Sequence, residues 1–112
     1  MKRGEIYYAN LSPTVGSEID KRRPAWVVSN DANNPAANTV TIIPITSNIT
    51  RIYPFEVLLN PEDSGLSKPS KVQAQQVRTI SKQRISSDAV GSLSKEIMQL
   101  VNTALKLHLD VD

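Results

Sequence analysis

The residues best placed to do chemistry lie in one stretch, residues 16–30 (GSEIDKRRPAWVVSN). Its polar first half ends in three adjacent cations: Lys21, Arg22 and Arg23. Pro24 follows, and the chain then becomes apolar at once. A loop that ends in an arginine and joins a buried strand can hold that cation still, and a guanidinium fork matches two phosphate oxygens. We therefore predict that Arg23 acts on a phosphate; the alternative is a loop cation paired with Glu18 or Asp20.

Cleavage of RNA needs few protein groups, because the 2′-hydroxyl of the RNA is itself the nucleophile. The protein must align that oxygen, help to remove its proton, stabilise charge on the phosphorane and help the 5′-oxygen to leave. Arginine suits the third task but is a poor general base, because its pKa lies above ~12. A hydroxyl can orient the 2′-hydroxyl, and Thr46 stands at the end of the next predicted strand. The single histidine, His108, excludes a two-histidine ribonuclease mechanism.

Length and composition limit the classes of protein to which the chain can belong. The 112 residues fit one domain. No stretch approaches the ~20 apolar residues of a membrane helix, and the first ten residues lack the apolar part of a signal peptide. The absence of cysteine excludes disulfides and thiolate metal sites. We expect a cytoplasmic protein that needs no metal or cofactor and does not enter a membrane.

The basic side chains are unevenly distributed along the chain. Residues 1–84 carry eleven Lys/Arg and seven Asp/Glu, a balance of +4, whereas residues 85–112 carry two and four, a balance of −2. This distribution is expected if the first three-quarters of the chain meets an anionic partner. The alternative is scatter in a small sample.

Alternating and apolar runs predict five strands, at residues 4–11, 26–28, 39–46, 55–59 and 70–80. The second should be buried on both faces, with Trp26 in the core and Pro24 at its first position. Pro44 cannot donate a ladder hydrogen bond, which predicts a sheet edge or a bulge. Apolar residues at helical spacing after residue 92, with Ser94 as N-cap, predict a terminal helix. Together, the five predicted strands and the terminal helix indicate a small, strongly curved antiparallel sheet or partly open barrel whose end the helix covers.

The last predicted strand carries three amides and an arginine, of which Gln73 and Gln75 share its polar face: Gln73, Gln75, Gln76 and Arg78. Amides can read base edges, and arginine can contact phosphate or stack on a base. The alternative is cross-strand hydrogen bonding on an exposed face.

Several short motifs occur in a fixed order along the chain: KRGEI at 2–6, LSP at 11–13, GSE at 16–18, Arg23-Pro24, PIT at 44–46, QVRTI at 76–80 and KQR at 82–84. In this order and spacing the chain resembles, over nearly its full length, the MazF/PemK family of toxin endoribonucleases. The resemblance implies one domain, residues 1–112, with a small SH3-like (CcdB/PemK-type) curved β-barrel and a C-terminal helix. It also implies a homodimer, inhibited by a cognate antitoxin whose disordered segment occupies the RNA groove.

The same resemblance implies an activity and a site. Members cleave single-stranded RNA at short sequences without a metal, leaving a 2′,3′-cyclic phosphate and a 5′-hydroxyl. In the branch that this chain resembles, the catalytic pair corresponds to Arg23 and Thr46, and the GSE loop lies over the site. The candidate RNA-binding residues are Ser17, Lys21, Arg22, Ser47, Gln73, Gln75, Gln76 and Arg78.

The chain departs from other members at the expected base. Where they carry a histidine, an arginine and an aspartate, this chain has Ser17, Gln73 and Gln75. Proton transfer would then fall to Arg23, to Glu18 or to water. The alternatives are an inactive RNA-binding relative and a non-catalytic CcdB-like toxin that binds DNA gyrase. The gyrase poison would depend on the end of the last helix, and the acidic LHLDVD ending disfavours it.

Overall fold

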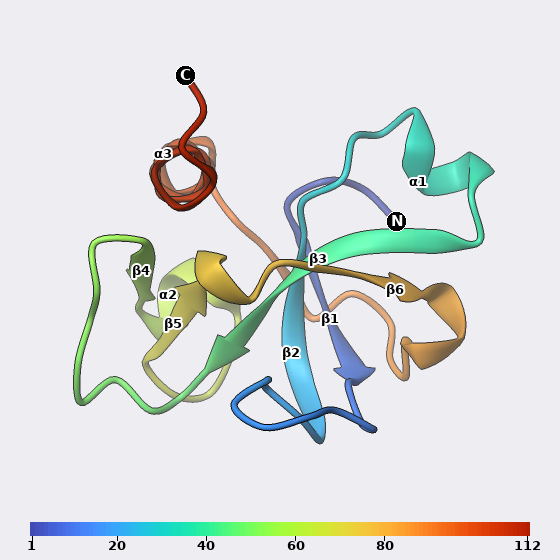
Figure 1. Ribbon diagram of the computed structural model, residues 1–112, viewed down its shortest axis with the longest axis horizontal. Coiled ribbons are helices and arrows are strands. Elements are labelled where there is room, and N and C mark those ends of the chain that lie inside the picture. The colour runs from blue at the N-terminus through green and yellow to red at the C-terminus, as the bar shows by residue number, and fades with distance from the viewer.

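The computed structural model describes all 112 residues as a curled sheet with one long helix packed against it (Figure 1). The strands are β1 (Glu5–Asn10), β2 (Arg22–Val27), β3 (Thr39–Thr46), β4 (Glu56–Leu59), β5 (Ser70–Gln73), β6 (Arg78–Ser81) and β7 (Gly91–Ser92). The helices are α1 (Asn33–Ala36), α2 (Pro61–Ser64) and α3 (Lys95–Leu109), with 3₁₀ turns η1 (Ala74–Gln76) and η2 (Lys82–Arg84). No helix is both long and apolar enough to cross a membrane.

The sheet is antiparallel throughout and runs in the order β4-β5-β3-β2-β1-β7. Strand β3 is its centre, because the first half of β3 pairs with β6 and its last residues pair with β5. The strands on either side of this change of partner diverge, which bends the sheet into a half-barrel (Figure 1). The predicted curved antiparallel sheet with a terminal helix is therefore confirmed.

The two faces of the sheet carry two separate cores, because successive side chains on a strand point to opposite faces. Trp26, Ile43 and Ile45 lie in the larger core, which α3 covers with Val101 and Ala104. The neighbouring strand positions, among them Ala25, Val27 and Ile42, lie in the smaller core inside the curl. Burial of the second predicted strand on both faces is confirmed for Trp26 and Val27, which are fully buried in different cores.

The predicted strand over residues 70–80 is wrong as one strand. It is broken by η1 into β5 and β6, at a point where Ala74 is fully buried. The β3–β6 ladder reaches Ile42, and the β3–β5 ladder begins at Ile45. Pro44 therefore lies opposite the break, where no neighbour needs its missing N–H. The sheet edge predicted from Pro44 is therefore wrong, because β3 is a central strand. The irregularity lies in the neighbouring segment of the sheet, at η1 between β5 and β6.

Two further boundaries differ from the sequence prediction. Strand β2 begins at Arg22, which pairs with β1, so Pro24 is its third residue; pairing with β3 starts only after Pro24, at Ala25. The short helices α1 and α2 occupy segments predicted as turns. The N-cap of α3 is confirmed, because the Ser94 side chain accepts a hydrogen bond from the Ile97 N–H.

Candidate active site

Arg23 and Thr46 lie on one face of the sheet, at the ends of adjacent strands. The β2–β3 register pairs Ala25 with Pro44 and, continued by two residues, places Arg23 opposite Thr46. Side chains directly opposite each other on neighbouring strands have Cβ atoms about 5 Å apart where pairing holds. The fold therefore places the two predicted catalytic residues at neighbouring strand ends, two residues beyond the last β2–β3 pair, on the face that carries the smaller core further along both strands.

The Arg23 guanidinium is oriented by the backbone rather than by a carboxylate. Its Nε donates to the Asp20 carbonyl at 3.1 Å, and its two terminal nitrogens make no hydrogen bond within the chain. The only ion pair in the structure lies elsewhere, so the alternative pairing of Arg23 with Glu18 or Asp20 is not formed. Arg23 is half-buried, and it presents a fixed cation with its bidentate edge unoccupied.

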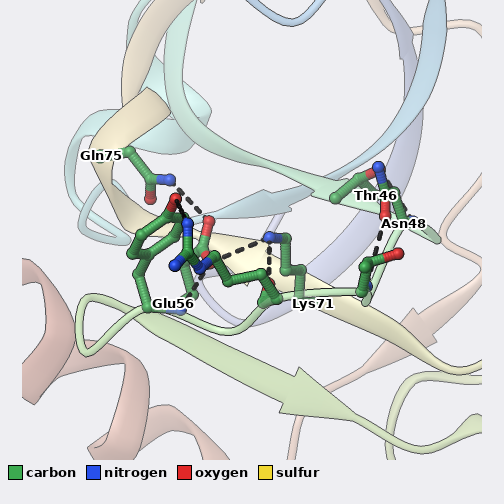
Figure 2. Close-up of polar contacts among 8 residues, drawn as sticks. Thr46, Asn48, Glu56, Lys71 and Gln75 are labelled. Atoms are coloured by element: carbon green, nitrogen blue, oxygen red, sulfur yellow. Dashed lines mark hydrogen bonds and ion pairs between the residues drawn. The ribbon is translucent and has the colours of Figure 1, made fainter.

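The Thr46 hydroxyl also keeps its donor free. Its Oγ1 accepts from the Asn48 N–H at 3.2 Å, and the Asn48 side chain accepts from the Thr50 N–H at 3.3 Å. The start of the loop after β3 is thereby folded back on Thr46 (Figure 2). A hydroxyl that accepts from the backbone can still donate its proton to a substrate oxygen.

Glu18 and Ser17 lie in the exposed loop between β1 and β2. The Glu18 carboxylate accepts from the Val15 N–H at 2.6 Å and contacts neither catalytic side chain. Gln76 ties this loop to η1: its amide nitrogen donates to the Ser17 carbonyl, and its amide oxygen accepts from the Ile19 N–H, each at 3.3 Å. The loop is held beside the site through Gln76 rather than through Glu18.

The basic candidates spread over both faces of the sheet. Lys21 is exposed and takes a left-handed backbone conformation with a φ of 66°. The Arg22 guanidinium lies 4.4 Å from the centre of the Tyr8 ring, on the face opposite to Arg23. Arg78 donates to the Leu11 carbonyl at 3.2 Å and is half-buried, on the same side as the β1–β2 loop. Ser47 is exposed directly after β3.

Gln73 and Gln75 are less exposed than an RNA-reading surface would suggest. Gln73 is buried, and the Gln75 amide donates to the Glu56 carboxylate at 2.6 Å. Both side chains have a buried amide oxygen without a hydrogen-bond partner. The alternative of cross-strand hydrogen bonding on an exposed face is therefore wrong for Gln73.

Beside Thr46 lies a buried ion pair that the sequence reading missed. Lys71 Nζ is 3.0 Å from the Glu56 carboxylate, and the two side chains are 9% and 1% exposed. Lys71 pairs with Thr46 in the β3–β5 register, so it lies on the same face. Its ammonium also donates to the Arg51 carbonyl at 2.7 Å, which anchors the loop between β3 and β4 (Figure 2).

Glu56 is held as a carboxylate. Burial alone would raise the pKa of Glu56, but the Tyr53 N–H, the Gln75 amide and the Lys71 ammonium outweigh it and hold the pKa below its ordinary 4.5. The sequence offered one sign of this role, because Glu56 is the only charged residue in the otherwise apolar strand predicted over residues 55–59. Its partner could not be identified, because the pairing of β4 with β5 brings Lys71 to it.

Comparison with known families decides what this arrangement is. The family model of the PemK-like, MazF-like toxins of type II toxin–antitoxin systems matches residues 2–109. The chain belongs to this family. As a family member it is 43% identical to Endoribonuclease MazF9 of Mycobacterium tuberculosis, over 99% of this chain and 98% of the relative. It is 37% identical to Endoribonuclease EndoA of Bacillus subtilis, over 97% and 94%.

Solved toxins of the family share the fold. MazF (Form-I) from Deinococcus radiodurans superposes with a TM-score of 0.85 at 26% identity, covering 99% of this chain and 97% of that one. An endoribonuclease from a mycobacterial species, in complex with its cognate antitoxin, gives 0.82 at 27% identity, covering 100% and 97%. The MazF/PemK resemblance read from the short motifs is confirmed, and so is the fold that it implied.

Proposed function

We propose that this protein is an endoribonuclease toxin that cleaves single-stranded RNA, with Arg23 and Thr46 as its catalytic residues. The observation that carries the proposal is the juxtaposition of an unpaired guanidinium edge and a free hydroxyl proton at the ends of β2 and β3. The curated relatives named above are endoribonucleases, which supports the same reading.

In this mechanism the RNA supplies its own nucleophile. The 2′-oxygen attacks the adjacent phosphorus while the bond to the 5′-oxygen breaks and that oxygen takes a proton from water, which leaves a 2′,3′-cyclic phosphate and a 5′-hydroxyl. Arg23 binds two non-bridging oxygens and stabilises the charge that grows on the phosphorane. Thr46 donates to the phosphate or orients the 2′-hydroxyl. The guanidinium supplies the positive charge, so the reaction requires no metal ion.

The proton of the 2′-hydroxyl needs an acceptor. Glu18 could take it only after leaving the Val15 N–H, which it contacts at 2.6 Å. Glu56 is already occupied by three donors, so it is committed to the fold. Glu18 after a loop movement, or a water molecule, is therefore the proposed acceptor.

RNA binding would use the polar groups around the catalytic pair. Ser17 and Lys21 belong to the loop between β1 and β2, to which Gln76 of η1 donates at the Ser17 carbonyl and Arg78 of β6 donates at the Leu11 carbonyl. Amides and guanidinium groups read unstacked bases by hydrogen bonding and stacking. Gln73 and Gln75 would contribute their unpartnered amide oxygens only after a small rearrangement, because these atoms are buried.

The proposed partners are a second copy of the chain and an antitoxin. Leu58 and Leu100 are 44% and 54% exposed, and both border an apolar hollow of about 390 Å³ between β4 and α3. Such a surface suits a homodimer contact. Solved relatives include toxins in complex with a cognate antitoxin and with MazE, which supports an antitoxin as the inhibitor.

The test is cleavage of a long single-stranded RNA by the pure protein and by two variants. Arg23→Ala removes a transition-state donor and should lower the rate by about 10²–10³-fold or more. Thr46→Val keeps the volume but removes the hydroxyl, and should also slow cleavage. Lys95→Ala, at the exposed start of α3, is the matched control. Wild-type cleavage by a folded Arg23→Ala variant would overturn the site, and gyrase inhibition by a protein that cuts no RNA would replace the function.

A further inference from the structure

A second basic site lies at the same end of the sheet as the catalytic pair. It is a pocket of about 240 Å³ between the start of β2, the end of β3 and the segment that leads into β5. Its polar lining includes the cations Arg22, Arg23 and Lys68 and the hydroxyls of Ser47, Ser67 and Ser70. None of the residues that line it is Asp or Glu. The chemistry of the pocket is therefore that of an anion site.

Most of the pocket lies on the face of the sheet opposite to the Thr46 side chain, and Arg23 of the proposed catalytic pair is among the residues that line it. Along β2, Arg22 and Pro24 alternate with Arg23, and along β3, Ile45 alternates with Thr46. Pro24 and Ile45 line the pocket, and Ile45 belongs to the larger core. The two sites thus adjoin at Arg23 and share the two strand ends.

The cations of the pocket are available for a ligand. The Arg22 guanidinium is fixed by stacking 4.4 Å from the centre of the Tyr8 ring and by its Nε, which donates to the Ser86 hydroxyl at 3.0 Å. Its terminal nitrogens and the Lys68 ammonium make no hydrogen bond or ion pair within the chain. An arginine held in one orientation with its terminal nitrogens free is preorganised for an oxyanion.

Hydroxyl groups complete the pocket. The side chains of Ser47 and Ser67 form no hydrogen bond within the chain, so both can donate to a ligand. Ser70 is buried, and its hydroxyl donates to the Lys68 carbonyl at 3.0 Å, which fixes the turn that carries Lys68. Two free cations and two free hydroxyls around a hollow without carboxylates match the donors that a phosphate group accepts.

We propose that this pocket binds a phosphate of the RNA substrate, next to or near the phosphate that is cleaved. An RNA strand that passes over the ends of β2 and β3 would meet Arg23 and Thr46 on one face and Arg22 and Lys68 on the other. The proposal rests on the proposed function for the identity of the ligand. It adds a binding site that adjoins the catalytic pair at Arg23, with Lys68 as a cation to which the cleavage chemistry gives no role.

The test measures binding of a 2′-O-methyl oligonucleotide, which has the phosphates of RNA but no free 2′-hydroxyl and cannot be cleaved by 2′-attack. Neutralising one phosphate contact in a single strand reduces the slope of log K against log salt by about 0.7, or roughly fivefold in affinity at 0.1 M salt. Arg22→Gln and Lys68→Gln should each lower the slope and affinity by about this amount. Lys106→Gln, on exposed α3, should change neither.

The outcomes separate this inference from the proposed function. Unchanged slopes in folded Arg22→Gln and Lys68→Gln proteins overturn the pocket, whether or not the wild type cleaves RNA. Reduced slopes support the pocket even if the wild type proves unable to cleave. If the Gln variants weaken binding of inorganic phosphate or of the antitoxin but not of the oligonucleotide, the pocket has another ligand and the assignment to RNA is wrong.

Discussion

The buried pair of Glu56 and Lys71 offers the sharpest test of how the site is supported. Replacing Lys71 with Met keeps much of its volume but leaves the Glu56 carboxylate buried, with only the Tyr53 N–H and the Gln75 amide as donors. Breaking a buried ion pair by removing one partner costs about 3–5 kcal/mol. Native domains have about 5–15 kcal/mol of stability in total. Lys71→Met should therefore remove a large fraction of the free energy of unfolding.

Thermal denaturation of the single and double variants measures this cost as a shift of the melting temperature, and urea denaturation measures it as a free energy. At about 4 °C per kcal/mol for a chain of this size, the unfolding midpoint of Lys71→Met should fall by about 12–20 °C. The double variant Lys71→Met with Glu56→Leu removes both charges and should recover part of the loss. Lys106→Met, an exposed lysine on α3, should stay within about 0.5 kcal/mol of the wild type. A cost below about 1 kcal/mol for Lys71→Met would refute the reasoning.

The Glu56–Lys71 pair also makes the free energy of unfolding depend on pH. The folded pKa of Glu56 lies below its ordinary 4.5, so folding is stabilised by the ionised form. This contribution is complete above the unfolded pKa and is lost as the pH falls through the folded pKa. Glu56→Gln should consequently be less stable near neutral pH and show a shallower loss of stability below about pH 4. If the stability of Glu56→Gln falls with decreasing pH as steeply as that of the wild type, other carboxylates cause the acid unfolding and this prediction is wrong.

Three further predictions concern other parts of the fold. Burial and the hydrogen bond to Glu5 raise the pKa of Tyr7 from 10.0 to about 12, so its contribution to stability is present below pH 10 and lost as the pH rises through 12; Tyr7→Phe should remove this alkaline loss in urea titrations. Gly91→Ala would place a Cβ 1.9 Å from the Ser64 carbonyl oxygen, and should lower the free energy of unfolding by about 1–3 kcal/mol or more. Gln76→Ala releases the loop between β1 and β2, and hydrogen exchange in that loop should become about fivefold faster, which corresponds to one net hydrogen bond.

Much of the fold is readable from residue patterns because the strands obey simple periodicities. The apolar run at Trp26 predicts a strand buried on both faces, and the helical spacing after Ser94 predicts α3; both are present. The break in the 70–80 strand could not be read, because Gln73 to Gln76 contains no glycine or proline. The break lies opposite Pro44 of β3, which is far away in the sequence. Two-residue β7 is too short to leave any pattern.

The candidate site, too, was predictable from the sequence only in part. Arg23 and Thr46 were predicted from local motifs, and both lie two residues beyond the last β2–β3 pair, at neighbouring strand ends. Glu56 and Lys71 were missed, because a buried ion pair between residues from β4 and β5 exists only once those strands pair. The pocket around Lys68 was also missed, since it forms where three separated segments meet.

The most direct test of the central claim is to map the ends of RNA fragments made by the pure protein in EDTA. Attack by the 2′-hydroxyl, stabilised by Arg23, predicts discrete cuts at one recurring short sequence. The 5′ ends should be hydroxyls that a kinase can label without prior phosphatase treatment, and the 3′ ends should be 2′,3′-cyclic phosphates. Cleavage that EDTA abolishes, or products with 5′-phosphates, would contradict the account.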